Sequence, residues 1–167
     1  MDTARSAFQI DLKFRPADEI LRESEAFFMK AGKVHETLKR LAMSLEEESI
    51  PYAIAGGMAL NLFGFTRETV AVDILLTAQG LERFKERLVG KWYVMAFAGA
   101  STSFRDAQTQ VKAETLITGE YPGDGKPKPV AFPDPTTSGV ERDSYRVIAL
   151  EKLIELKLVS GMTAPPA

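Results

Sequence analysis

The sequence contains no cysteine and only one histidine, His35. The absence of cysteine excludes disulfide bonds, zinc–thiolate sites and thiol nucleophiles. One histidine cannot build a multi-histidine metal site, and a Ser-His-Asp triad would have to use this residue. The polar helical stretch around it, KVHETLKR, instead predicts a histidine exposed on a helix.

Long apolar runs are also lacking. No run approaches the roughly 18 residues that a membrane span needs, so no membrane association is expected. The N-terminal stretch MDTARSAFQIDLKFRPADE has no apolar core of a signal peptide, and a cytoplasmic protein is predicted. The formal net charge of −2 argues against a nonspecific nucleic-acid binder, although it allows a local basic patch.

The remaining composition is that of an ordinary globular protein. Its 167 residues are 45% hydrophobic and 26% charged, which predicts one compact domain with a substantial core. Within it we expect an N-terminal helical segment over residues 1–49 and a core over residues 50–167.

Hydrophobic periodicity and the glycine and proline positions predict a mixed α/β (α+β) fold, a small mixed sheet flanked by helices. A break or kink is expected at Ala31-Gly32, and a long loop over 118–139. The predicted helices cover 18–29, 33–48, 58–63, 81–89 and 150–160. The predicted strands cover 52–55, 69–76, 92–97, 103–106, 110–117 and 145–149.

Apolar residues near the N-terminus raise the question of oligomeric state. Ile20, Leu21, Phe27 and Phe28 spread around more than one face of the first predicted helix. Burying either phenylalanine is worth roughly 1.5–3 kcal/mol, so we expect both to be covered. The covering surface is either the domain itself or a second copy, so a monomer and a homodimer are both open.

The stretch AGGMALNLFGFTRETVAVDILLT, residues 55–77, holds the first candidate site. Gly56 and Gly57 lead from a predicted strand into a helix. Without Cβ atoms the backbone can approach a phosphate closely, and the N–H groups of a helix N-terminus favour an anion. A glycine pair on its own is equally typical of a tight turn that requires positive φ.

Two acidic residues lie in predicted strands that are otherwise mostly apolar. Asp73 lies in VAVDILLT and Glu114 in VKAETLIT. Buried carboxylates are unfavourable unless they are paired or bind a metal. If the strands are neighbours, the two side chains converge on a hard cation such as Mg²⁺. The alternative, that both lie at strand ends in solvent, stays open on residue pattern alone.

These residues together resemble the signature of the minimal nucleotidyltransferases of the polymerase-beta-like superfamily, close to the AbiE-type toxin branch of toxin–antitoxin systems. That signature is a glycine pair opening a helix, an Arg-x-Thr, and a strand with Asp-x-Asp. The similarity continues through VDILLTAQGLERF, LITGEYPGDGKPKPVAFPDP and LEKLIELKLVSGMTAP, so it covers most of the chain from about residue 50 onward.

The resemblance implies transfer of a nucleoside monophosphate from a nucleoside triphosphate to an acceptor, which the sequence does not identify; RNA and protein are both open. Carboxylates hold Mg²⁺ in that mechanism. By position, Asp73 and Glu114 are the catalytic and metal-binding acids that the resemblance implies. The residues implied in nucleotide binding are Gly56, Gly57, Arg67, Thr69 and Lys157.

The chain departs from the signature at its centre. The first acid of Asp-x-Asp should fall at Ala71, and Phe63 and Ala113 also differ from what the family pattern suggests. Loss of a shared ligand predicts that Mg²⁺ binding is weak or absent and that transfer is impaired. A second hypothesis is a non-catalytic nucleotide-binding module. A third is an engineered chain, in which Ala71, Ala113 and AGASTS at 98–103 make room for a small molecule.

Overall fold

The computed structural model describes residues 16–161. Its helices are α1 (Ala17–Glu47), α2 (Gly56–Leu62), α3 (Ala78–Leu88), α4 (Pro135–Ser138) and α5 (Leu150–Ser160). Its strands are β1 (Ala53–Ala55), β2 (Ala71–Leu76), β3 (Tyr93–Met95), β4 (Ser103–Asp106), β5 (Lys112–Ile117), β6 (Gly139–Arg142) and β7 (Tyr145–Ile148). None of the helices in this range is both long enough and apolar enough to cross a membrane.

The strands form one mixed sheet in the order β3-β4-β5-β2-β1-β7-β6. β2 pairs in parallel with β5 and antiparallel with β1, and β1 pairs in parallel with β7. The remaining pairs are antiparallel. A strand in the centre of a sheet is covered on both faces, which explains the nearly continuous apolar sequence AVDILL of β2. The sheet and its flanking helices confirm the predicted α/β (α+β) fold class.

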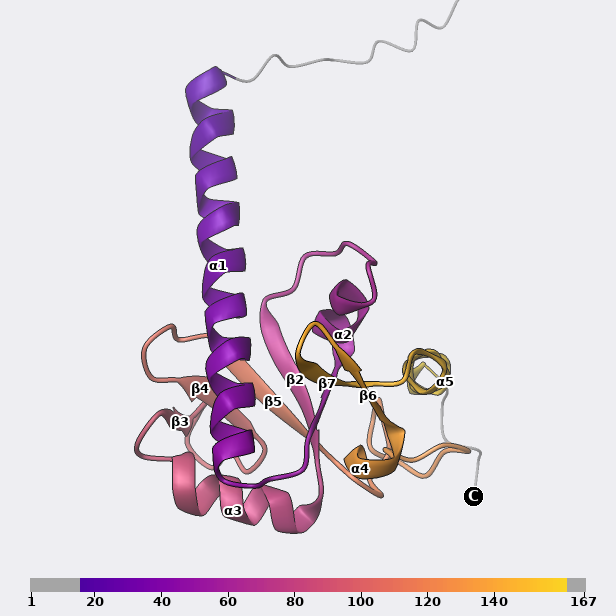
Figure 1. Cartoon of the computed structure of the whole chain (residues 1–167). Coiled ribbons are helices and arrows are strands. Elements are labelled where there is room, and N and C mark those ends of the chain that lie inside the picture. The colour runs from indigo at the N-terminus through magenta and orange to yellow at the C-terminus, as the bar shows by residue number, and fades with distance from the viewer. Residues whose placement is uncertain (1–15, 162–167) are drawn as a thin grey trace, which may run out of the picture.

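Helices cover both faces of the sheet. On one face, the Phe84 ring of α3 lies 4.9 Å from the Phe104 ring of β4, and a threonine of α1 hydrogen-bonds to Asp106 of the same strand. Strand alternation and register place Ala113 of β5 on this α1–α3 face. α2 and α5 lie on the opposite face, where they line a cleft together with Asp73. Figure 1 shows α1 and α5 on different sides of the sheet.

The prediction of a break at Ala31-Gly32 is wrong, because α1 runs without interruption from Ala17 to Glu47. A glycine inside a helix costs about 1 kcal/mol relative to alanine, which does not end a helix that the neighbouring residues favour. The C-terminal part of α1 packs on the sheet through Val34, Leu38, Leu41 and Leu45, which recur at helical spacing and are buried. His35 is exposed, as predicted.

The N-terminal half of α1 extends beyond the sheet (Figure 1). Phe27 is 50% exposed and Phe28 is 71% exposed, so the domain does not cover either ring fully. Of the two alternatives for covering these rings, burial by the domain's own surface is therefore wrong for the single chain. Residues 1–15 of the predicted N-terminal segment lie outside the described range.

The structure corrects the predicted loop over 118–139 and the ends of two predicted strands. The segment expected to be a loop over 118–139 ends in α4 and leads into β6, which pairs with β7. The turn between β6 and β7 uses Asp143 and Ser144 at φ 50° and 69°. It therefore lacks the glycine that marks such turns in a sequence. Thr69 precedes β2, and Trp92 precedes β3.

Asp106 is fully buried at the end of β4 and holds α1 against the sheet. Arg40 Nη1 donates to both of its carboxylate oxygens, at 2.7 and 2.6 Å. Thr37 Oγ1 donates at 3.0 Å, and the backbone N–H groups of Gln108 and Thr109 donate at 2.8 and 3.3 Å. A buried carboxylate is tolerated when it is paired and hydrogen-bonded in this way.

Candidate functional site

The chain turns from β1 into α2 at the glycine pair. Gly56 has φ +61°, a conformation that favours glycine, and a Cβ there would lie 2.8 Å from Cγ of Asp73. Gly56 is therefore required both for the turn and for the close approach of the backbone to Asp73. The tight-turn interpretation of the glycine pair thus holds, and the turn also forms one wall of the space beside the acid.

Arg67 and Thr69 lie beside Gly57, on the loop between α2 and β2. A Cβ on Gly57 would meet Thr69 Oγ1 at 3.1 Å and Arg67 Nε at 3.5 Å. Asn61 of α2 fixes this loop, because its Nδ2 donates to Thr69 Oγ1 and its Oδ1 accepts from the Arg67 backbone N–H, both at 3.0 Å. Thr69 thus positions the loop, while the Arg67 side chain reaches the cleft.

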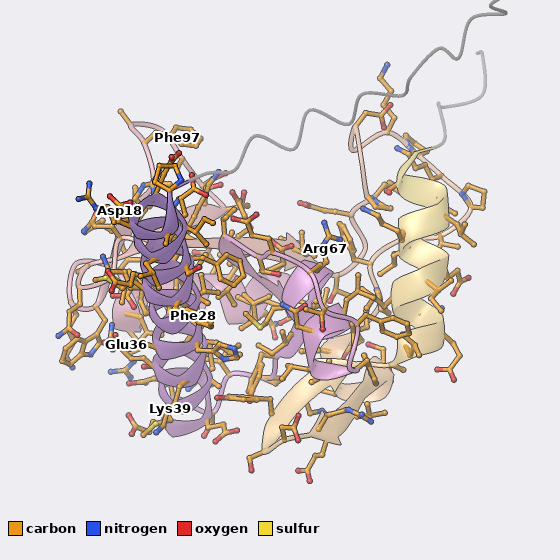
Figure 2. The ribbon with its side chains drawn as sticks, turned by 90° about the horizontal axis from the view of Figure 1, so that it is seen from above. Asp18, Phe28, Glu36, Lys39, Arg67 and Phe97 are labelled. Atoms are coloured by element: carbon orange, nitrogen blue, oxygen red, sulfur yellow. The ribbon has the colours of Figure 1, made fainter. Side chains whose placement is uncertain are left out.

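A cleft of about 330 Å³ lies between α2, β2 and α5. Five of the residues that the sequence singled out line it: Gly56, Gly57, Arg67, Asp73 and Lys157. The other lining residues are apolar and come from α2 and α5: Leu60, Leu153, Ile154 and Leu158. Figure 2 shows Arg67 between α1 and α5 when the molecule is seen from above.

Asp73 and Glu114 are direct partners in the parallel pairing of β2 and β5. Strands paired in this way lie about 4.8 Å apart, and in-register side chains share a face. The two carboxylates therefore converge, as the site hypothesis required. The pKa of Asp73 is raised to about 6 from its ordinary value of 3.8, chiefly by burial and also by the negative charge of Glu114, while Lys112 opposes the shift.

Glu114 has two close partners that the sequence analysis missed. Lys112 Nζ lies 2.5 Å from Glu114 Oε1, and Ser103 Oγ donates to Glu114 Oε2 at 2.5 Å. The signal for Lys112 was present in VKAETLIT, since residues two apart in a strand share a face. Ser103 is brought to Glu114 by the antiparallel pairing of β4 with β5, whose register the strands predicted at 103–106 and 110–117 do not give.

The residues present do not fit a Mg²⁺ ion of the kind that the resemblance implies. Within residues 16–161, no three His, Cys, Asp or Glu side chains are grouped to hold a metal. Ala71 contributes no ligand, and both oxygens of Glu114 already have partners. The ammonium group of Lys112 beside the carboxylates also opposes a divalent cation. The metal site is therefore incomplete in its ligands and in its charge.

A second cavity, of about 400 Å³, is lined by Ala71 and Lys112, each two residues before one of the carboxylates in its strand. Four of its lining residues are basic, and none is acidic: Lys30, Lys33, Arg105 and Lys112. They come from α1, β4 and β5, which the sequence pattern does not connect. This is a local basic patch in a chain whose net charge is −2.

Two other departures from the family pattern lie away from the cleft. Ala113 is 1% exposed and faces the α1–α3 side, so its small side chain makes no room beside Asp73. Phe63 follows α2, and the Arg142 guanidinium lies 5.3 Å from the centre of its ring. Arg142 also donates to the Leu62 carbonyl at 2.7 Å, which ties the end of α2 to β6.

No family model matches the chain, and no curated protein matches it. A solved structure that it resembles is that of a protein from Thermotoga maritima, described as a "putative nucleotidyltransferase". The two chains are 17% identical, the match covers 86% of each, and the TM-score is 0.53. At this identity the likeness concerns the fold alone. The chain has a nucleotidyltransferase-like fold.

Proposed function

We propose that the chain binds a nucleoside triphosphate in the cleft between α2 and α5, and that nucleotidyl transfer is strongly impaired in it. The observation that carries this proposal is the cleft itself. It brings together the glycine turn, Arg67 and Asp73 from residues 55–77 with Lys157 from α5. Its volume of about 330 Å³ is within the usual range for a small-molecule site.

The chemistry of the cleft suits a ligand with an anionic end and an apolar end. Arg67 and Lys157 supply positive charge for phosphate oxygens, which both side chains recognise well. Gly56 and Gly57 allow the backbone to approach such a group closely. The exposed apolar side chains of α5, Ile154 at 49% and Leu158 at 69%, offer a surface for a base.

The same cleft is poorly equipped for the transfer reaction. Ala71 stands where a metal-bridging carboxylate is expected, and the resemblance assigns the reaction to metal-bound acids. An RNA or protein hydroxyl is the acceptor that the resemblance implies. We therefore expect binding without appreciable turnover.

Titration calorimetry with ATP, GTP, CTP and UTP tests the binding. At least one nucleotide should bind, and Lys157→Ala and Arg67→Ala should each weaken it by about tenfold or more, because each removes a charged hydrogen-bond donor. Lys152→Ala is the matched control, since Lys152 is on the same helix but pairs with Glu155 at 2.8 Å outside the cleft. If none of the four nucleotides binds, the proposal is wrong.

Incubation with labelled nucleotide and Mg²⁺ should give negligible transfer, and robust turnover would contradict the impairment.

We also propose that the chain forms a homodimer through the N-terminal half of α1. Ile20 and Phe27 continue the helical spacing of the buried stripe that begins at Val34, while Leu21 and Phe28 lie on other faces of the helix, and all four side chains are exposed in the single chain. A second copy of the same half-helix would cover them, as symmetric pairs commonly do.

Sedimentation of the intact chain should show a dimer, and the double variant Phe27→Asp, Phe28→Asp should sediment as a folded monomer. Met43→Asp is the control, because Met43 is 52% exposed in the part of α1 that lies on the sheet. A wild-type chain that stays monomeric at high concentration would rule out this interface.

A further inference from the structure

The residue that faces Ala71 across the sheet is a lysine. In the parallel pairing of β2 with β5, Ala71 is the partner of Lys112 and Asp73 is the partner of Glu114. All four residues therefore lie on the face that carries the cleft. The place where the family pattern has its first carboxylate is thus directly opposite a positive charge.

Lys112 already forms an ion pair with Glu114. Its Nζ lies 2.5 Å from Glu114 Oε1, while Ser103 Oγ donates to Oε2 at 2.5 Å. The Glu114 side chain is 27% exposed, so water screens this pair only in part. A metal ion at Glu114 would have to displace the ammonium group or share the carboxylate with it.

The surroundings add further positive charge. Lys30, Lys33 and Arg105 line the adjoining cavity together with Lys112, and none of its lining side chains is acidic. Such a cluster repels a divalent cation and attracts an anion. Ala71, which supplies no carboxylate, and Lys112, which adds positive charge, therefore both disfavour a divalent cation at this site.

We infer that Lys112 is a resident cation of this site: its ammonium group neutralises Glu114, excludes a divalent metal ion, and lets the cleft bind a phosphate-bearing ligand without one. The exclusion of metal stands on the Ala71–Lys112–Glu114 geometry. The metal-free binding of the ligand rests on the proposed function.

The pairing of Ala71 with Lys112 predicts the effect of restoring the missing acid. In Ala71→Asp, the new carboxylate lies opposite Lys112 and forms an ion pair with it. That single variant should gain little metal affinity. Lys112→Met removes the charge but keeps most of the aliphatic stem, so the fold is retained. Only the double variant Ala71→Asp, Lys112→Met presents three acidic groups on one face with no lysine paired to any of them; Ser103 still donates to Glu114.

Calorimetric titration with Mn²⁺, in the absence of nucleotide, tests the exclusion of metal. We expect no measurable binding by the wild type or Ala71→Asp, and binding by the double variant that is tighter by about 10–100-fold or more than that of either single variant. Lys33→Met is the matched control: it removes a charge from the same cavity without touching Glu114, and it should leave Mn²⁺ binding unmeasurable. Thermal melts verify that each variant is folded.

Two outcomes would overturn the inference: micromolar Mn²⁺ binding by the wild type, or equal affinity in Ala71→Asp and the double variant. A separate titration with ATP in EDTA and in excess Mg²⁺ tests the metal-free ligand. Equal affinity under both conditions supports it, and binding that requires Mg²⁺ contradicts it. If ATP binds under neither condition, the proposed function fails, while the Mn²⁺ titrations still decide the role of Lys112.

Discussion

Replacing Asp106 by alanine lowers the free energy of unfolding by about 3–5 kcal/mol. The carboxylate is fully buried and accepts hydrogen bonds from Arg40, Thr37 and two backbone N–H groups. Its removal leaves the Arg40 guanidinium partly buried and without its buried carboxylate partner. It also removes the acceptor for the buried donors of Thr37 and Thr109, and a buried donor left without its partner is costly.

Urea denaturation of the Asp106→Ala variant measures this loss. Glu36→Ala is the matched control, because Glu36 also pairs with Arg40, at 2.6 Å, but its side chain is 54% exposed. An exposed i,i+4 pair of this kind contributes about 0.3–0.5 kcal/mol. If the two variants lose similar stability, the buried network does not anchor α1 to the sheet.

Most of the sheet was predictable, because each of its central strands has its own local signal. β2 is apolar along nearly its whole length, and β5 alternates between buried and partly exposed residues. Both strands can therefore be recognised from hydrophobic periodicity alone. The length of α1 was not predictable. Gly32 suggests a break, but the residues on both sides favour helix, and the sum of their preferences outweighs one glycine.

The edge of the sheet shows a different limit of the sequence. β6 carries the burial pattern of an edge strand, with three exposed residues, so hydrophobic periodicity gives no sign of it. It exists because β7 offers a partner and because Asp143 and Ser144 adopt positive φ in the turn between them. Both conditions depend on structure that forms elsewhere.

Within the candidate site, the residues that the family signature names were found, and the residues that modify it were missed. Gly56, Asp73 and Glu114 come from the motif, and the fold places them together. The significance of Lys112 depends on the register of β2 against β5, which no local pattern specifies. A one-residue shift would have turned Lys112 and Glu114 together away from the face that carries Asp73.

The same register explains an energetic conflict at Asp73. The carboxyl group is held between Gly56 and Glu114, and burial is the largest cause that raises its pKa to about 6. It has no hydrogen bond among the interactions of the described residues to offset this burial. Sites that keep an acid in such surroundings are commonly functional, because the structure gains no stability from it.

Replacing Asp73 by asparagine should therefore stabilise the chain above pH 6 by about 2–3 kcal/mol and flatten the pH profile of its stability below that. The sign follows from the raised pKa. The folded chain holds the Asp73 proton more tightly than the unfolded chain, in which the pKa is near 3.8. Wild-type stability consequently falls as the pH rises from about 4 to about 6, and asparagine, which does not titrate, avoids that loss.

Urea denaturation of the wild type and of Asp73→Asn between pH 4 and pH 8 measures the difference. Asp134→Ala provides a contrast of opposite sign, because hydrogen bonds from the Thr136 hydroxyl and backbone N–H lower the pKa of Asp134. That carboxylate contributes stability above its unfolded pKa, and the contribution disappears as the pH falls. A variant at Asp73 that is no more stable than the wild type at pH 8, with an unchanged profile, would show that the acid is not under strain. A stabilised variant that has also lost nucleotide affinity would instead show that Asp73 is retained for the ligand rather than for the fold.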